Sequence, residues 1–220
     1  MSPEKSGPRS WLLTAGLVAI LPLLVGAHFV LKAQRAKVQP LEVLGTLPDF
    51  KLTDQQGKAF TAADLDGKLW VVDFFFTRCS GVCPLLYERM KEVRRFADAH
   101  PRFASRIGLL SITVDPTSDT PERLGEYAKQ HAIDPTGWRL ATGPAQAIED
   151  VVVQGFHVAM GQPEGDVAGG RFDILHGTHL VLVDDHHRIR GYFDGDPAGV
   201  TRLERDLGGF LEARDKEAQR

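Results

Sequence analysis

The chain of 220 residues contains only two cysteines, Cys79 and Cys83, which are separated by three residues and followed by Pro84. They come directly after residues 69–76, whose length and β-branched and aromatic composition predict a strand buried on both faces. Apolar residues then recur at spacings of three and four, which predicts an amphipathic helix: Val82, Leu86, Met90, Val93 and Ala97. The sequence therefore predicts Cys79 in the turn between strand and helix, and Cys83 in or near the first turn of the helix.

Two cysteines in this position have specific chemistry. Unpaired N–H groups and the positive end of the helix dipole favour thiolate over thiol, so we expect a lowered cysteine pKa. Residues four apart at a helix start lie about 5–6 Å from each other. That separation suits a disulfide, whose Cα atoms lie about 4.4–6.8 Å apart, and it suits two sulfurs on one metal ion equally well. Simple burial of two small apolar side chains is the remaining alternative.

Composition and the N-terminal segment indicate where this chemistry takes place. With 26 Lys and Arg against 29 Asp and Glu, the net charge of −3 gives no indication of a nucleic-acid partner. Residues 11–31 carry no formal charge and are long enough for a transmembrane anchor; a signal peptide cleaved after Ala27 is the alternative. A short tail (residues 1–10) before a large domain favours a single-pass protein with its domain on the exported, periplasmic or equivalent, side. Disulfides persist in such compartments.

The rest of the chain alternates strand and helix patterns. We expect a tether at residues 32–46, a domain at residues 47–214 and a C-terminal tail at residues 215–220. Further strands are predicted at 107–114, 138–141, 180–183 and 189–193, and further helices at 119–131, 144–154 and 197–214. This order predicts an α/β fold with a mixed sheet flanked by helices. Cysteines at the first strand-to-helix turn make it thioredoxin-like.

Of the eight histidines, two are placed to act with the cysteines. His176 and His179 immediately precede the predicted strand 180–183, and in a thioredoxin-like sheet the loop before that strand faces the turn that carries the cysteines. His186 and His187 lie at a predicted hairpin tip, where we expect them to be solvent-facing and loosely held.

Several of these residues together resemble the Sco/SenC family, which consists of membrane-tethered, thioredoxin-fold copper proteins that assist assembly of the binuclear copper centre of cytochrome c oxidase. The resemblance rests on residues 76–84 with both cysteines, on residues 113–122, and on His176 in register with Phe193. It covers about residues 44–212 together with the N-terminal anchor. It implies Cys79, Cys83 and His176 as copper ligands, and the copper-bearing subunit of the oxidase as partner. The sequence does not identify the copper donor.

The chemistry of this ligand set fits copper independently. Thiolates are soft ligands that hold Cu(I), and imidazole suits both Cu(I) and Cu(II). Two sulfurs and one nitrogen leave a coordination position open, through which copper can pass to a partner, whereas structural zinc sites are closed by four ligands. We therefore expect a binding protein rather than an enzyme.

Asp73 supports an alternative, a membrane-anchored thiol–disulfide oxidoreductase. It lies inside the predicted buried strand, where the Sco/SenC pattern more usually has an apolar residue, and it matches the buried aspartate of thioredoxins, which is suited to proton transfer. A structural hydrogen bond to nearby backbone or to Lys68 is equally compatible with a buried acid. Against the alternative, reductases place a proline where Thr178 stands and have two residues, not three, between their cysteines.

Overall fold

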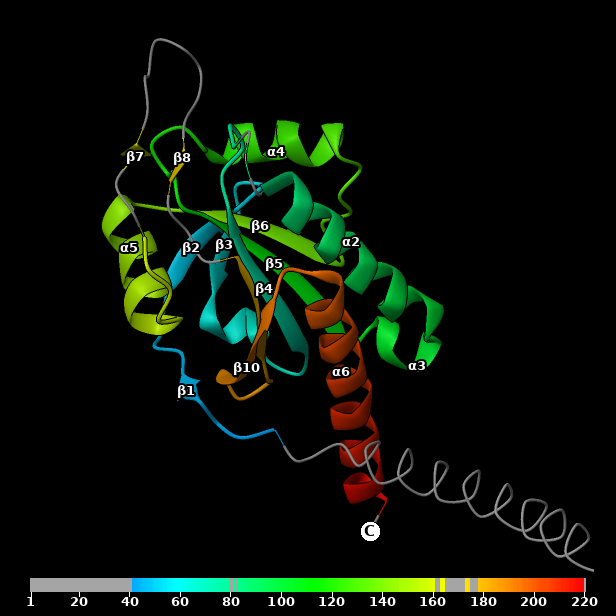
Figure 1. Cartoon of the computed structure of the whole chain (residues 1–220). Coiled ribbons are helices and arrows are strands. Elements are labelled where there is room, and N and C mark those ends of the chain that lie inside the picture. The colour runs from blue at the N-terminus through cyan, green and yellow to red at the C-terminus, as the bar shows by residue number, and fades with distance from the viewer. Residues whose placement is uncertain are drawn as a thin grey trace, which may run out of the picture. The chain divides into compact units, whose positions relative to one another are not determined.

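The computed structural model describes residues 41–79, 81, 83–160, 163–164, 173–174 and 178–219 (Figure 1). Strand β4 (Leu69–Phe75) is the central element and is buried along all seven of its residues. On one side it pairs in parallel with β5 (Ile107–Thr113), which pairs in parallel with β6 (Trp138–Thr142). On its other side it pairs antiparallel with β9 (His179–Val183).

Short strands complete both edges of this sheet. β10 (Arg188–Asp194) follows β9 in a hairpin and pairs with β1 (Gly45–Thr46), while β2 (Lys51–Asp54) and β3 (Ala59–Thr61) lie beyond β6. The strand order is β1-β10-β9-β4-β5-β6-β2-β3. A separate pair is formed by β7 (Pro163–Glu164) and β8 (Asp173–Ile174). The mixed α/β sheet predicted from the sequence is thus confirmed.

The helices use the apolar stripes that the sequence predicts. Helix α2 (Cys83–Ala99) buries Cys83, Leu86, Met90, Val93 and Ala97. Helix α6 (Pro197–Ala218) packs beside α2 (Figure 1). Helix α4 (Pro121–Gln130) is capped by Thr120, whose hydroxyl accepts the N–H of Arg123. The remaining helical segments are η1 (Ala62–Leu65), α3 (Pro101–Ala104) and α5 (Ala145–Glu149), which continues into the π-helical turn η2 (Asp150–Gly155).

Two predicted boundaries differ from the structure. Helix α6 runs to Ala218 and so includes most of the predicted tail 215–220, because Asp215 forms ion pairs with Arg102 at 2.9 Å and Arg106 at 2.6 Å. In the predicted tether 32–46, the pair Gly45–Thr46 already hydrogen-bonds to β10.

The predicted tail 1–10 and anchor 11–31 lie outside the described residues. Within the part of the chain that the structure describes, no helix is long and apolar enough to cross a membrane.

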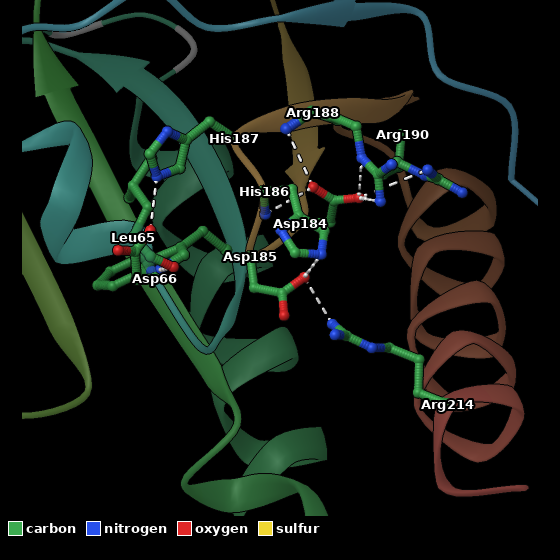
Figure 2. Close-up of polar contacts among 10 residues, drawn as sticks. Leu65, Asp66, Asp184, Asp185, His186, His187, Arg188, Arg190 and Arg214 are labelled. Carbon is green, nitrogen blue, oxygen red and sulfur yellow. Dashed lines mark hydrogen bonds and ion pairs between the residues drawn. The ribbon is translucent and has the colours of Figure 1, made fainter. Parts of the chain in front are cut away.

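The β9–β10 hairpin is fixed by buried charge (Figure 2). Asp184 is fully buried and accepts the backbone N–H groups of His186 and Arg188, and it forms ion pairs with the side chains of Arg188 and Arg190. The next residue, Asp185, pairs with Arg214 of α6 at 2.6 Å.

The expectation that both histidines of this hairpin are loosely held is wrong for His187. Its backbone is left-handed (φ 60°) and its Nε2 lies 2.8 Å from Asp66 Oδ1 (Figure 2). The contact of His187 with Asp66 and the ion pair of Asp185 with Arg214 therefore link this end of the sheet to the turn after η1 and to α6.

Candidate metal-binding site

Cys79 and Cys83 meet where β4 ends and α2 begins. Cys83 is the first residue of α2, and its backbone N–H donates to the sulfur of Cys79 at 3.4 Å. Cys83 is buried and Cys79 is half-buried. The sulfur of Cys79 therefore lies at the N-terminus of the helix, where N–H groups and the dipole favour a thiolate.

The two thiols differ in environment. The hydrogen bond with Cys79 and burial raise the pKa of Cys83, the negative charges of Cys79 and Asp73 add to this, and a backbone hydrogen bond at Phe76 opposes it. The expectation that the helix start lowers the cysteine pKa is therefore wrong for Cys83. A metal ion that binds this sulfur must displace its proton.

Asp73 is buried next to Cys83 and has a partner that the sequence did not identify. On the neighbouring strand β5, Ser111 stands directly opposite Asp73, and its hydroxyl donates to the carboxylate. Trp138 of β6 in turn donates its indole N–H to Ser111 Oγ at 2.8 Å. The ammonium of Lys68 lies 5.9 Å from the ring centre of Trp70.

A small cavity connects this buried group to the cysteine. Asp73, Cys83, Ser111, Tyr127 and Trp138 are among its lining residues, and its volume is about 10 Å³. That volume is close to the minimum of about 10–15 Å³ that one water molecule needs. Burial, followed by the negative charges of Asp73 and Cys83, raises the pKa of Tyr127, so its hydroxyl is neutral at physiological pH.

A buried carboxylate holds the turn that carries Cys79. Asp119 accepts the backbone N–H of Thr77 at 3.0 Å, the hydroxyl of Thr77, and the hydroxyl of Thr113 at 2.6 Å. Asp119 is fully buried, and burial raises its pKa against the opposing effect of these hydrogen bonds. Thr77 is two residues before Cys79, so these hydrogen bonds hold the turn that carries the cysteine. We call them the Thr77–Asp119 clasp.

A second link fastens the same turn from the outside. The guanidinium of Arg78 forms an ion pair with Asp115 at 2.9 Å and donates to Ser118 Oγ at 2.6 Å. Residues 113–122, to which no role at the site was assigned from the sequence, thus support the cysteine turn. Their position directly after a predicted strand could have indicated this role. The carboxyl ends of neighbouring parallel strands meet at one edge of a sheet, so residues after one strand lie near residues after the next.

The start of β9 lies at this same edge. Strand β9 is antiparallel to β4, so its first residues lie near the end of β4. The carbonyl of Thr178 accepts the N–H of Gly195, and a Cβ on Gly195 would lie 2.5 Å from Leu86 of α2 and 2.7 Å from that carbonyl. Glycine therefore allows Thr178 to approach the first turns of α2.

Of the two predicted histidines, the structure describes only His179. His179 is exposed and its Nε2 lies 3.3 Å from Asp194 Oδ1. His176 lies outside the described residues. Among the residues that are described, no three His, Cys, Asp or Glu side chains are grouped as a metal site.

Comparison with known proteins gives consistent matches. A family model described as SCO1/SenC matches residues 39–207. An SCO2-like protein of Rickettsia conorii is 30% identical over 200 residues, which cover 86% of this chain and 93% of the relative. The structure of Bradyrhizobium japonicum ScoI with copper bound is 27% identical, with a TM-score of 0.62 over 73% of this chain and 99% of that one.

A further similarity concerns the fold alone. BsSco, described as a member of the Sco family of cytochrome c oxidase assembly proteins with a disulfide switch, is 22% identical. Its TM-score is 0.64, over 77% of this chain and 98% of that one.

Proposed function

Since the chain belongs to the SCO1/SenC family, we propose that it binds copper as its cargo and assists assembly of the binuclear copper centre of cytochrome c oxidase. The observation that carries this proposal is the pair of cysteines where β4 ends and α2 begins, with the Cys83 N–H directed at the sulfur of Cys79. Two thiolates in this position suit Cu(I).

His176 completes the proposed ligand set with Cys79 and Cys83. It precedes His179 by three residues, which span at most about 10–11 Å when extended. The neighbouring Thr178 already lies beside Leu86 of α2, next to Gly195, so the chain can reach the cysteines. His179 is occupied by Asp194, which supports His176 as the ligand. Three ligands leave a position open for transfer to the partner.

Neighbouring residues hold the proposed ligand Cys79 in position. The Thr77–Asp119 clasp and the Arg78–Asp115 ion pair hold the turn that carries Cys79. Groups that orient ligands in this way improve metal affinity by reducing the cost of ordering them. The partner in this proposal is the copper-bearing subunit of the oxidase.

The proposed location is a membrane, with residues 11–31 as an uncleaved anchor and the domain on the exported side. The apolar, uncharged composition of this segment supports it. The mature protein should retain Met1 or Ser2 and stay with membranes after a high-salt wash. A mature N-terminus at His28 would instead establish a cleaved signal peptide.

Copper loading of ligand variants tests the function. The full chain, reduced and purified in an uncharged detergent, should bind one copper ion. Cys79→Ser, Cys83→Ser and His176→Ala should each weaken binding strongly, whereas the matched control His179→Ala should not. If His176→Ala leaves affinity and spectrum unchanged, the ligand assignment is wrong; if neither cysteine variant loses copper, the function itself is wrong.

The thiol–disulfide oxidoreductase is the second proposal, because Asp73 and Cys83 line one cavity. It requires turnover with a protein disulfide substrate, and this turnover should fall in Asp73→Asn. Absence of turnover together with tight Cu(I) binding would exclude it.

A further inference from the structure

A cleft of about 710 Å³ lies between α2 and the turn that follows α4. Sites for small molecules usually have volumes of about 300–1,000 Å³. We call it the α2–α4 cleft. Helix α2 contributes Tyr87, Lys91, Arg94, Arg95 and Asp98, and the opposite side includes Lys68, His131, Asp134 and Trp138.

The charged side chains of the α2–α4 cleft are mainly basic. Four lining residues carry permanent positive charge, and these are Lys68, Lys91, Arg94 and Arg95; the lining acids are Asp98 and Asp134. Carboxylates partly neutralise two of the cations, because Arg94 pairs with Asp98 at 2.7 Å and Lys91 with Glu88 at 3.0 Å.

Two of these cations have other neighbours but form no ion pair with the residues that the structure describes: the ammonium of Lys68 lies 5.9 Å from the Trp70 ring centre, and the charge of Arg95 opposes the raised pKa of Glu204. In the described part of the chain, no carboxylate lies within ion-pair distance of Lys68 or Arg95. Asp134 is held by its own turn, where it accepts the N–H and hydroxyl of Thr136. Partial burial and the charge of Lys91 lower the pKa of His131, so this ring is a neutral hydrogen-bonding group at pH 7.

The α2–α4 cleft shares a wall with the cysteine site. Tyr87, Ile133 and Trp138 line both this cleft and the small cavity that contains Cys83 and Asp73. Tyr87 stacks on Trp138 with ring centres 5.6 Å apart, and its hydroxyl donates to the carbonyl of His131. A ligand in the cleft would therefore touch the side chains that enclose Cys83.

We propose that the α2–α4 cleft binds a small organic anion with two or more phosphate or carboxylate groups, held chiefly by Lys68 and Arg95. The size of the cleft suits a molecule of metabolite size, and the two cations that lack a carboxylate partner favour a multiply charged oxyanion. This site is distinct from the copper ligands and does not depend on the proposed function.

Calorimetric titration with inorganic pyrophosphate, and separately with citrate, tests this proposal on the full-length, reduced, copper-free protein in uncharged detergent. Saturable binding of one anion is expected, together with a shift of the Trp138 indole N–H signal in NMR spectra. The double variant Lys68→Gln/Arg95→Gln should bind at least about tenfold more weakly, a loss of about 1.4 kcal/mol. Copper stoichiometry should stay unchanged in this variant.

The matched control is Arg102→Gln/Arg205→Gln, which removes the same charge from exposed positions outside the cleft. An equal loss in this control would mean that net charge alone attracts the anion, and the proposal would be wrong. It would also be wrong if neither probe binds saturably at about 1 mM. Binding only to phosphatidylglycerol vesicles, dependent on Lys68 and Arg95, would assign the cleft to a lipid headgroup and overturn the small-anion proposal.

Discussion

Asp119 holds the cysteine turn through hydrogen bonds from Thr77 and Thr113. Asp119→Ala removes their acceptor and leaves buried donors unsatisfied, at a cost of about 1–3 kcal/mol for each. We expect the free energy of unfolding of residues 40–220, a compact unit, to fall by about 2–4 kcal/mol in urea titrations. Copper affinity should fall about 10–100-fold.

Asp119→Asn distinguishes support of the site from simple loss of stability. Its oxygen can still accept from the Thr77 N–H and the Thr113 hydroxyl, so most of the copper affinity should return. Asp134→Ala, in an exposed turn, is the control and should change neither quantity appreciably. Unchanged copper affinity in Asp119→Ala would contradict the role of the clasp.

Gly195 is a second residue on which the geometry of the site depends, because there is no room for a side chain at this position. In Gly195→Ala the new methyl group would overlap the Thr178 carbonyl and Leu86, so β9 and α2 must separate. We expect a loss of about 1–3 kcal/mol in unfolding free energy and weaker copper binding. Gly208→Ala in α6 has no close neighbour below 3.9 Å and should instead stabilise by about 0.5–1 kcal/mol. Equal stability of the two variants would show that the sheet edge tolerates the added methyl group.

At the residue scale, the sequence predicted the reactive groups better than their supports. Cys79 and Cys83 were identifiable because they are the chain's only cysteines and follow a recognisable strand. The roles of Ser111 and Asp119 were missed because their contacts with Asp73 and Thr77 span 38 and 42 residues. Such contacts depend on strand register, which no local pattern reveals. The raised pKa of Cys83 likewise depends on burial rather than on its place in the helix.

The ion pair between Asp185 and Arg214 connects the β9–β10 hairpin to α6 (Figure 2). Burial opposes ionisation of Asp185, but the hydrogen bond and charge of Arg214 lower its pKa. A lowered aspartate pKa contributes stability that is present above the ordinary value, near pH 4, and is lost as pH falls through the lowered value.

Arg214→Gln should therefore reduce the free energy of unfolding by about 0.5–1 kcal/mol at pH 7, a value discounted for the exposure of the arginine. The difference from the native protein should shrink as pH falls below about 4. Arg205→Gln, which alters an exposed pair between adjacent residues, is the control. A difference for Arg214→Gln that is independent of pH would assign the effect to packing on Phe210.

Elements with a clear period were predicted well, and so were the five-residue strands β6 and β9, whereas the two-residue strand β1 was not. The buried strands β4 and β5 and the helices α2, α4 and α6 have enough residues for hydrophobic spacing to show. β1 has only two residues, too few for any alternation to show. These residues were therefore assigned to the tether, and the sequence did not predict their pairing with β10. The continuation of α6 to Ala218 depends on Asp215 reaching Arg102 and Arg106, which lie far away in sequence.

For the whole molecule, the redox state of the cysteine pair should control copper. A disulfide between Cys79 and Cys83 would consume both sulfurs and leave only His176 of the proposed ligands. We expect the oxidised full-length protein to retain no copper after desalting, and thiol reduction to restore one ion per chain. Metal analysis along a series of redox buffers measures this directly. Copper retained by the oxidised form with an unchanged spectrum would contradict it.

The strand order of the sheet has a consequence for how the chain matures. β4 and β9 are neighbours, yet β9 begins more than a hundred residues after β4 ends. A chain that emerges with its N-terminal part first can complete β4–β5–β6 while one side of β4 still has open backbone N–H and C=O groups. Open strand edges recruit other chains. Nascent or prematurely terminated molecules that lack residues 179–183 are therefore the forms most in need of a chaperone.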